Sequence, residues 1–498
     1  MQDVLIIGAG FGGLGAALTL AESGARVTLC EALNYPGGCA STFTRGGHTF
    51  ESGATLFSGF SPQQLFADWI ARHRLDVKTV ALDPIVELRA PRLRLPISSD
   101  RERLIDELCR LPGAPAERIR GFFELQRRVS ATLWPLLDEP SLLPPFTLSS
   151  LARHASRLPR YAPLLTLAGR PLLSVLRAHG VAQFAPLRLF IDAVCQITVQ
   201  ASAEEAEAPL ALAALDYFFR GTRHVQGGIG VLATALAGAV EELGGEVRFA
   251  DAVKSVEPLG TTRRAGFRVV TRTGAIEART VVANLLPQDL RALVRVPIAS
   301  ARLDRLTRGL EGGWGAVMLF RALLDAQALP RTAAHLELIA DPDAPLIEGN
   351  HLFCSLSAAD EKEGPQGARS LTVSTHLALQ KLRAQDDAGQ AALVAQVQAR
   401  MRATLSALAP EFAATSMELT GSPRTFARFT RRSGGAVGGV PRIAGLHHYR
   451  DLAPLEAQPG LFLVGDSVFP GQSILAAATG GERAAAKILA RLAPSTSN

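Results

Sequence analysis

The chain has 498 residues, enough for two or three domain-sized units with a buried core. Its mean hydropathy is +0.17, but no uninterrupted apolar run reaches the roughly 18 residues of a membrane-spanning helix, and a net charge of +6 is too small to indicate nucleic acid as a partner. Five scattered cysteines without a C-x-x-C spacing and ten histidines without ligand spacing indicate a reducing, cytoplasmic setting and no bound metal.

The N-terminal segment has the pattern of a dinucleotide-binding unit. An apolar run at 4–7 predicts a buried parallel strand, G-x-G-x-x-G follows, and an Ala/Leu helical pattern ends at Gly24. A second strand at 27–30 ends on Glu31, where an acid accepts hydrogen bonds from ribose hydroxyls. The glycines allow a sharp turn and close approach to a pyrophosphate at the helix N-terminus. The candidate nucleotide-binding residues here are Gly8, Ala9, Gly10, Phe11, Gly12, Gly13 and Glu31.

Residues 141–191 contain six arginines and no Asp or Glu. On a helix, Arg153 and Arg157 share one face and Leu151 and Leu158 lie on the opposite one, before Pro159 interrupts the pattern. A cationic and apolar surface of this kind fits the plane of an anionic bilayer, so we predict peripheral membrane contact. The alternative is a leucine-lined core with a solvated arginine face.

The middle of the chain alternates strand and helix patterns. The glycines of 227–230 indicate a turn that starts a helix, and strand patterns at 266–272 and 278–286 predict a small β-meander packed on the nucleotide-binding unit. Further strands at 315–324, 335–341 and 370–377 and a long helix around 391–408 predict a second, mixed α/β unit. We predict two domains, each built from separate segments of the chain. The cofactor-binding domain comprises 1–75, 215–290 and 431–498, and the substrate-binding domain comprises 76–214 and 291–430.

The stretch "LFLVGDSVFPG" at 461–471, near the end of the chain, bears on whether the bound dinucleotide is NAD or FAD. Glu31 already argues against the 2′-phosphate of NADP. FAD carries a ribityl chain whose hydroxyls need a further acceptor, and a second parallel strand ending at Gly465-Asp466 beside the glycine loop would supply it. The alternative role of Asp466 is the N-cap of a helix.

The block "YPGGCASTFTRGGHTFESGAT" at 35–55, together with "LFLVGDSVFPGQS" at 461–473, resembles the phytoene desaturase family of flavin-dependent carotenoid desaturases and isomerases. The closest similarity is to the branch that introduces the 3,4 (or 3′,4′) double bond of an acyclic carotenoid. The resemblance implies a Rossmann-type FAD-binding domain of the flavin amine oxidase-like superfamily, a discontinuous mixed α/β substrate domain and a helical membrane-contact region.

The resemblance also implies roles for individual residues. The counterparts of Gly37 and Gly38 approach the pyrophosphate, that of Thr55 lies near the flavin ring, and that of Val253 meets the adenine through its backbone. The counterpart of Asp466, after Gly465, binds the ribityl chain, and the helix that includes Ile474 points its N-terminus at the pyrimidine edge of the flavin. Departures from the family pattern include Cys39, Glu51 and Ser473.

The sequence has one dinucleotide-binding motif and no second G-x-G-x-x-G after a strand, so it shows no separate site for NAD(P)H. The expected chemistry follows from this. FAD would take a hydride from a long apolar polyene and pass the electrons to oxygen or a quinone; no acid–base pair stands out, so no catalytic residue is named. An isomerase using reduced FAD and a non-catalytic lipid escort of the same fold are the alternatives. An amine oxidase would usually set aromatic walls beside the flavin, and a G-x-S-x-G hydrolase elbow is absent from the sequence.

Overall fold

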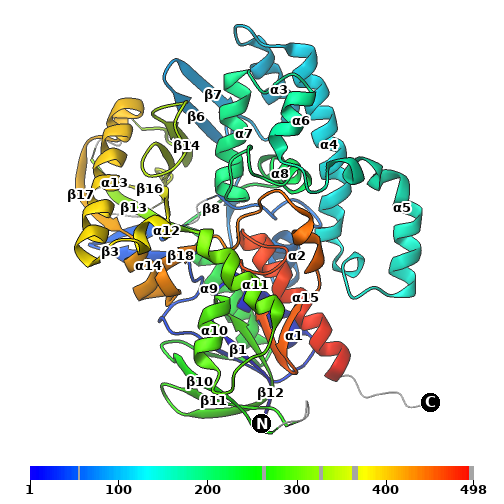
Figure 1. Cartoon of the computed structure of the whole chain (residues 1–498). Helices are drawn as coiled ribbons and strands as arrows, with labels where there is room; N and C mark the ends of the chain where they lie inside the picture. The colour runs from blue at the N-terminus through cyan, green and yellow to red at the C-terminus, as the bar shows by residue number, and fades with distance from the viewer. Residues whose placement is uncertain (54–55, 261–264, 325–328, 362–367, 493–498) are drawn as a thin grey trace.

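The computed structural model describes residues 1–53, 56–260, 265–324, 329–361 and 368–492. Within these residues the chain forms two eight-stranded sheets, two small two-stranded sheets and a group of helices. Figure 1 shows the first large sheet near the N-terminus, at the bottom of the view, and the second large sheet above it at the left. Across these described residues, no helix combines the length and apolar character needed to cross a bilayer.

The first sheet has five parallel strands in the order β9–β2–β1–β12–β20. Three further strands, β10, β11 and β19, join it by antiparallel pairing. Its strands are β1 (Gln2–Ile7), β2 (Val27–Cys30), β9 (Glu246–Arg248), β10 (Val253–Pro258), β11 (Phe267–Thr271), β12 (Ala275–Asn284), β19 (Leu455–Gln458) and β20 (Leu461–Val464). The predicted strands at 4–7 and 27–30 are confirmed as parallel neighbours.

The long strand β12 has a larger role than the sequence predicted. Along the side away from β1, its first half pairs with β11 through Ala278 and Phe267, and its second half pairs with β20 through Val281 and Leu461. The predicted β-meander is therefore not a separate unit packed on the nucleotide-binding sheet, because β12 is a central strand of that sheet. It also lies between β1 and β20 in the sheet. The end of β20 nevertheless lies beside the glycine loop, as the sequence predicted, because a Cβ on Gly12 would be 3.0 Å from Gly465 N.

Helices α1 (Phe11–Glu22), α9 (Ile229–Glu242) and α15 (Ile474–Leu492) pack together against this sheet. The glycine turn at 227–230 starts α9 as predicted, with Gly228 at φ 86° as its N-cap. Helices α1 and α15 cross closely because both carry glycine at the crossing: a Cβ on Gly15 would lie 2.5 Å from Ala478 O, and one on Gly481 would overlap Gly12 O. The first and last helices of the chain are thus in backbone contact.

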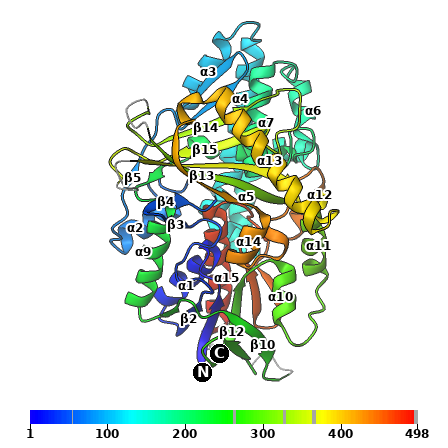
Figure 2. The same cartoon turned by 90° about the vertical axis from the view of Figure 1, so that its left-hand side faces the viewer.

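The second sheet has the order β17–β13–β16–β15–β14–β6–β7, with β18 pairing at the edge of β13. The three predicted strands of this region and the long helix are confirmed, and α13 (Asp387–Leu408) lies across the strands in Figure 2. Its strands are β6 (Val86–Ala90), β7 (Leu93–Ile97), β13 (Trp314–Leu323), β14 (Ala334–Ile339), β15 (His351–Leu356), β16 (Arg369–Ala378), β17 (Thr415–Gly421) and β18 (Ala436–Val437).

Six α-helices joined by loops lie within residues 101–214. They are α3 (Arg101–Arg110), α4 (Ala116–Asp138), α5 (Leu148–Leu167), α6 (Leu172–Ala178), α7 (Ala185–Thr198) and α8 (Ala208–Ala214). The predicted interruption at Pro159 is wrong: α5 runs through Pro159 and Pro163 to Leu167, although neither proline can donate a backbone hydrogen bond. Only Ser150 and Leu167 of α5 are buried, and Figure 1 shows this helix at the edge of the molecule.

The α1–α15 crossing makes a testable prediction about stability. Gly481→Ala should lower the free energy of unfolding by about 1–3 kcal/mol, because the added methyl group meets the backbone of α1. Gly238→Ala in α9 is the matched control, since a Cβ there meets nothing within 4 Å, and it should raise the stability by about 0.5–1 kcal/mol. Urea unfolding followed by circular dichroism measures both; equal effects would contradict the role of the crossing.

Candidate functional site

Four parallel strands of the first sheet end at one cavity. β1 leads into Gly8, β2 into Glu31, β12 ends on Asn284, and β20 leads into Gly465. All four residues line a cavity of about 700 Å³. Ligands of open α/β sheets bind at the carboxyl ends of the strands, so the topology places a binding site here.

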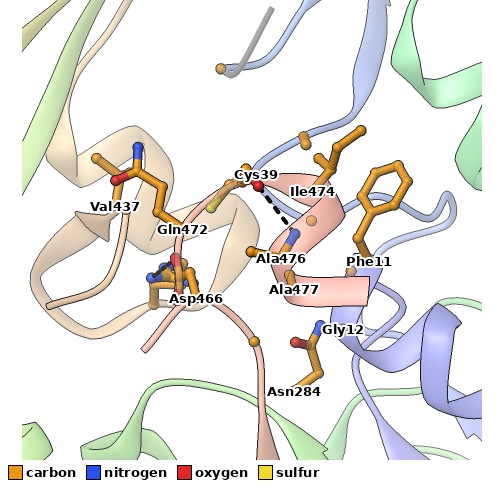
Figure 3. A pocket seen from close by; sticks show the side chains of 18 of the residues that line it. Phe11, Gly12, Cys39, Asn284, Val437, Asp466, Gln472, Ile474, Ala476 and Ala477 are labelled. Carbon is orange, nitrogen blue, oxygen red and sulfur yellow. Dashed lines mark hydrogen bonds and ion pairs between the residues drawn. The ribbon is translucent and has the colours of Figure 1, made fainter. Parts of the chain in front are cut away.

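The glycine loop packs around the side chain of Asn284, a residue outside the predicted site. A Cβ on Gly10 would lie 2.6 Å from Asn284 Nδ2, and a Cβ on Gly12 or Gly465 would lie 2.7 Å from Asn284 Oδ1. These glycines therefore make room for the amide as well as for a ligand. The signal in the sequence was a polar residue closing the apolar run "TVVAN" at 280–284. Figure 3 shows Asn284 beside Gly12 at the cavity wall.

Glu31 is buried, and its two carboxylate oxygens both face backbone donors. Oε2 accepts from the N–H of Ala9 at 2.7 Å, and Oε1 accepts from the N–H of Leu33 at 2.8 Å. Burial raises the pKa of Glu31, against the opposing effect of these hydrogen bonds. A carboxylate has about four acceptor positions, so ribose hydroxyls can still bind to it.

Asp466 does not cap a helix, because the next helix, α15, begins eight residues later at Ile474. Its Oδ2 forms an ion pair with Nη2 of Arg432 at 2.8 Å, and its Oδ1 accepts from the hydroxyl of Ser467 at 3.2 Å. Both Asp466 and Arg432 line the cavity. No sequence motif marks Arg432, because it lies in the loop after α14 (Pro423–Thr430).

The N-terminus of α15 also reaches the cavity. Ser473, at φ 94°, accepts a hydrogen bond from the N–H of Ala476 at 3.1 Å. Ile474 lines the cavity and lies near Phe11 of α1 in Figure 3. Free N–H groups and the positive end of the helix dipole therefore face the same space as the glycine loop.

Most of the residues that the sequence singled out converge on this cavity. Ala9 and Gly13 are not among its lining residues: the Ala9 amide donates to Glu31 instead, and a Cβ on Gly13 would overlap Gly8 O, so Gly13 serves the packing of α1. Thr55 lies outside the described residues. The predicted residues that line the cavity are Gly8, Gly10, Phe11, Gly12, Glu31, Gly37, Gly38, Val253, Gly465, Asp466 and Ile474.

The far part of the cavity is mainly apolar. Helix α4 contributes four side chains from its last turns, and α8 and the second sheet supply further hydrophobic side chains. The polar side chains that the second sheet brings to this part are Ser374, Thr375 and His376 of β16. Among the described side chains, no three of His, Cys, Asp or Glu gather closely enough to hold a metal ion. The apolar lining includes Leu133, Trp134, Leu136, Leu137, Leu210, Ala213, Ala214, Met318 and Phe353.

Two orphaned amide oxygens show what kind of ligand the cavity would hold. Oε1 of Gln200 and Oε1 of Gln472 are buried in its wall and have no partner within the described part of the chain. The amide nitrogen of Gln472 donates to Ile197 O at 2.6 Å, which fixes the orientation of that amide. Buried acceptors of this kind need a donor. A dinucleotide with an N–H-bearing ring system fits them, as the glycine loop and Glu31 fit its phosphates and ribose.

The fold and the site thus define a dinucleotide-binding protein of the Rossmann class. A model of the flavin containing amine oxidoreductase family matches residues 11–489. The chain belongs to that family; it is an FAD-dependent oxidoreductase.

Three relatives illustrate the range of the similarity. Chloroplastic prolycopene isomerase of Arabidopsis thaliana is 25% identical over 520 residues, covering 98% of this chain and 83% of the relative. Neurosporene-forming phytoene desaturase of Rhodobacter capsulatus is 25% identical over 302 residues, covering 57% of this chain and 52% of the relative. The crystal structure of an oxidoreductase from Methanosarcina mazei superposes with a TM-score of 0.65 at 16% identity, covering 99% and 100% of the two chains. The resemblance to carotenoid desaturases and isomerases is therefore confirmed.

Asp466→Ala should weaken FAD binding about 10- to 100-fold, because it removes charged hydrogen bonds worth about 1.5–3 kcal/mol. Glu31→Ala should have a similar effect. The measurement is the flavin absorbance retained by the purified protein after dialysis, together with a titration of apoprotein with FAD.

Asp451→Ala is the matched control. Asp451 also forms ion pairs with arginines, Arg302 at 3.4 Å and Arg305 at 2.9 Å, but it is not among the cavity-lining residues. This variant should keep its FAD. Full flavin occupancy in Asp466→Ala would remove Asp466 from the cofactor site.

Proposed function

We propose that this oxidoreductase desaturates an acyclic carotenoid at the 3,4 (or 3′,4′) position. The observation that carries the proposal is one cavity with two chemically distinct parts: a polar part at the strand ends and an apolar part on α4, α8 and the second sheet. When bound, FAD supplies a hydride acceptor. The apolar part offers a long hydrocarbon a water-poor surface beside it, since apolar burial drives such binding.

The residues proposed for the cofactor are those of the strand ends. The glycine loop and Gly37-Gly38 would approach the diphosphate, Glu31 would accept from the adenosine ribose, and Asp466 would accept from the ribityl chain. In support, these residues line the same cavity, and the N–H-rich start of α1 faces it.

We also propose that 1–75, 215–290 and 431–498 form the FAD-binding domain and that 76–214 and 291–430 form the substrate-binding domain. In support, all strands of the first sheet fall within the first set of ranges. The strands of the second sheet fall within the other set, apart from β18 at Ala436–Val437.

Isomerisation of a carotenoid with reduced FAD is the second candidate. The observation that favours it is similarity to a prolycopene isomerase along 98% of this chain, against 57% for the phytoene desaturase. Both reactions use the same cofactor and the same substrate class. They differ in the mass of the product.

The reaction is tested by incubating the holoenzyme with lycopene or a 1-hydroxylated acyclic carotenoid under air, and analysing the products by liquid chromatography with mass detection. Desaturation should give a product that is lighter by two hydrogen atoms and absorbs further to the red, because the conjugated system is one double bond longer. The Asp466→Ala protein, depleted of flavin, is the control.

A product of unchanged mass, formed without oxygen when the flavin is reduced beforehand, would instead establish the isomerase. Oxygen or a quinone is proposed as the final electron acceptor of the desaturase. Omitting each acceptor in turn under argon would show which one sustains turnover.

We further propose that α5 contacts an anionic membrane surface. Its exposed leucines Leu148, Leu151, Leu158 and Leu165 are 88%, 50%, 63% and 80% exposed, and their spacing of three and seven residues places them on one side of the helix. Arg153 and Arg157 both pair with Glu139. The apolar side of α5, rather than these two paired arginines, is therefore the main element of the proposed contact.

Replacing Leu151 and Leu158 together by Asp should abolish most co-flotation with vesicles of phosphatidylcholine and phosphatidylserine, because carboxylates resist burial at the interface. Leu243→Asp is the control, since Leu243 is 40% exposed at the end of α9. The flavin content should stay unchanged in both proteins. Undiminished flotation of the double variant would contradict the contact.

A further inference from the structure

Arg442 is a fixed part of the cavity wall. Its backbone N–H donates to Val199 O at 2.9 Å, and its carbonyl accepts from the N–H of Glu207 at 2.9 Å. These two bonds tie the loop after β18 to the ends of α7 and α8. The position of the side chain is therefore set by elements outside its own loop.

The polar contacts of the Arg442 guanidinium are to neutral acceptors. Nη2 donates to Pro470 O at 3.2 Å, and Nη1 lies 3.5 Å from Nδ1 of His448. His448 Nε2 donates to Ile443 O at 2.7 Å, which leaves Nδ1 as an acceptor, and burial lowers the pKa of His448 to about 4. Among the described residues, no carboxylate pairs with Arg442, and burial lowers its pKa to about 10.

This charge lies at the start of α15. A Cβ on Gly471 would be 2.5 Å from Arg442 Nη2, and Gly471 precedes the first residue of the 19-residue helix by three positions. The positive end of the helix dipole adds to the guanidinium charge. By contrast, Arg432, on the same cavity, is neutralised by Asp466. The corner at Arg442 and the start of α15 therefore carries a positive charge that the protein leaves uncompensated.

The orphaned oxygen of Gln472 shows which part of the cofactor fits this corner. Gln472 follows Gly471 directly, and its buried Oε1 lacks a partner within the described chain; Figure 3 shows its side chain near Val437. A diphosphate offers acceptors only and would leave Oε1 unsatisfied. The pyrimidine edge of a flavin offers an N–H donor between carbonyl acceptors, so its chemistry would suit both Gln472 Oε1 and the Arg442 guanidinium.

We propose that Arg442 selectively stabilises the reduced, anionic form of the bound FAD. The inference rests on the FAD site and holds for either carotenoid reaction. A hydride taken from the substrate adds one negative charge to the ring system, while the substrate loses its proton to water or a base. An uncompensated guanidinium beside the ring favours that charge, because its interaction is strong where water is scarce.

The test is the midpoint potential of the bound flavin, measured spectroscopically during stepwise reduction with a reference dye. Arg442→Gln should reduce the preference for reduced over oxidised FAD about tenfold, equal to about 30 mV for a two-electron couple. Arg442→Lys, which keeps the charge, should recover part of the shift. Arg442→Met is a second neutral replacement if the Gln variant does not fold.

Arg483→Gln is the matched control. Arg483 also donates to backbone carbonyls, of Pro144 at 3.1 Å and Leu452 at 2.7 Å, and burial lowers its pKa to about 10. It is not among the cavity-lining residues, so its removal should leave the potential unchanged.

An unchanged potential in both Arg442→Gln and Arg442→Met would overturn the inference. If the binding of oxidised FAD were weakened at the same time, Arg442 would be assigned to the diphosphate instead. Failure of the wild-type protein to bind any FAD would refute the cofactor site itself, and failure to convert a carotenoid would refute the proposed reaction while leaving the potential measurement valid.

Discussion

The site depends on the close packing of three distant chain segments around one buried amide. The glycine loop after β1, the end of β12 and the loop after β20 meet at the side chain of Asn284, with no room for a Cβ on Gly10, Gly12 or Gly465. The backbone contact between α1 and α15 holds the same segments together on the other side. Residues that are more than 450 positions apart in the chain thereby form one wall of one cavity.

The charged side chains of this cavity differ in whether the protein itself compensates their charge. Glu31 is buried among backbone N–H donors, and Asp466 is matched by Arg432, so both carboxylates are compensated before any ligand binds. Arg442 has only neutral acceptors and lies beside the positive end of a helix. A redox cofactor that gains negative charge on reduction would meet a different environment at each end, which is how a protein tunes a flavin without taking part in its covalent chemistry.

The second sheet and the helices of 101–214 serve the other half of the cavity. They supply aliphatic and aromatic side chains, among them Trp134 of α4 and Phe353 of β15, and few charges. Helix α4 leads through residues 139–147 into α5, whose leucines are exposed. The apolar wall of the cavity and the apolar side of α5 thus belong to consecutive helices, an arrangement that would suit the proposed carotenoid substrate.

The sequence by itself determined the local units: the strand–glycine–helix–strand unit that ends on Glu31, the buried strand before Asp466, and the strands and long helix of the second sheet. These units are recognised from the spacing of apolar residues and from the positions of glycines, and both patterns depend only on residues that are near one another in the sequence. Only the tertiary structure decided that β12 lies between β1 and β20, that α5 continues through Pro159, and that Arg432 pairs while Arg442 does not. The partner of a strand or of a charged side chain depends on which segments meet in space. The residues around an arginine in a loop therefore do not predict whether it forms an ion pair.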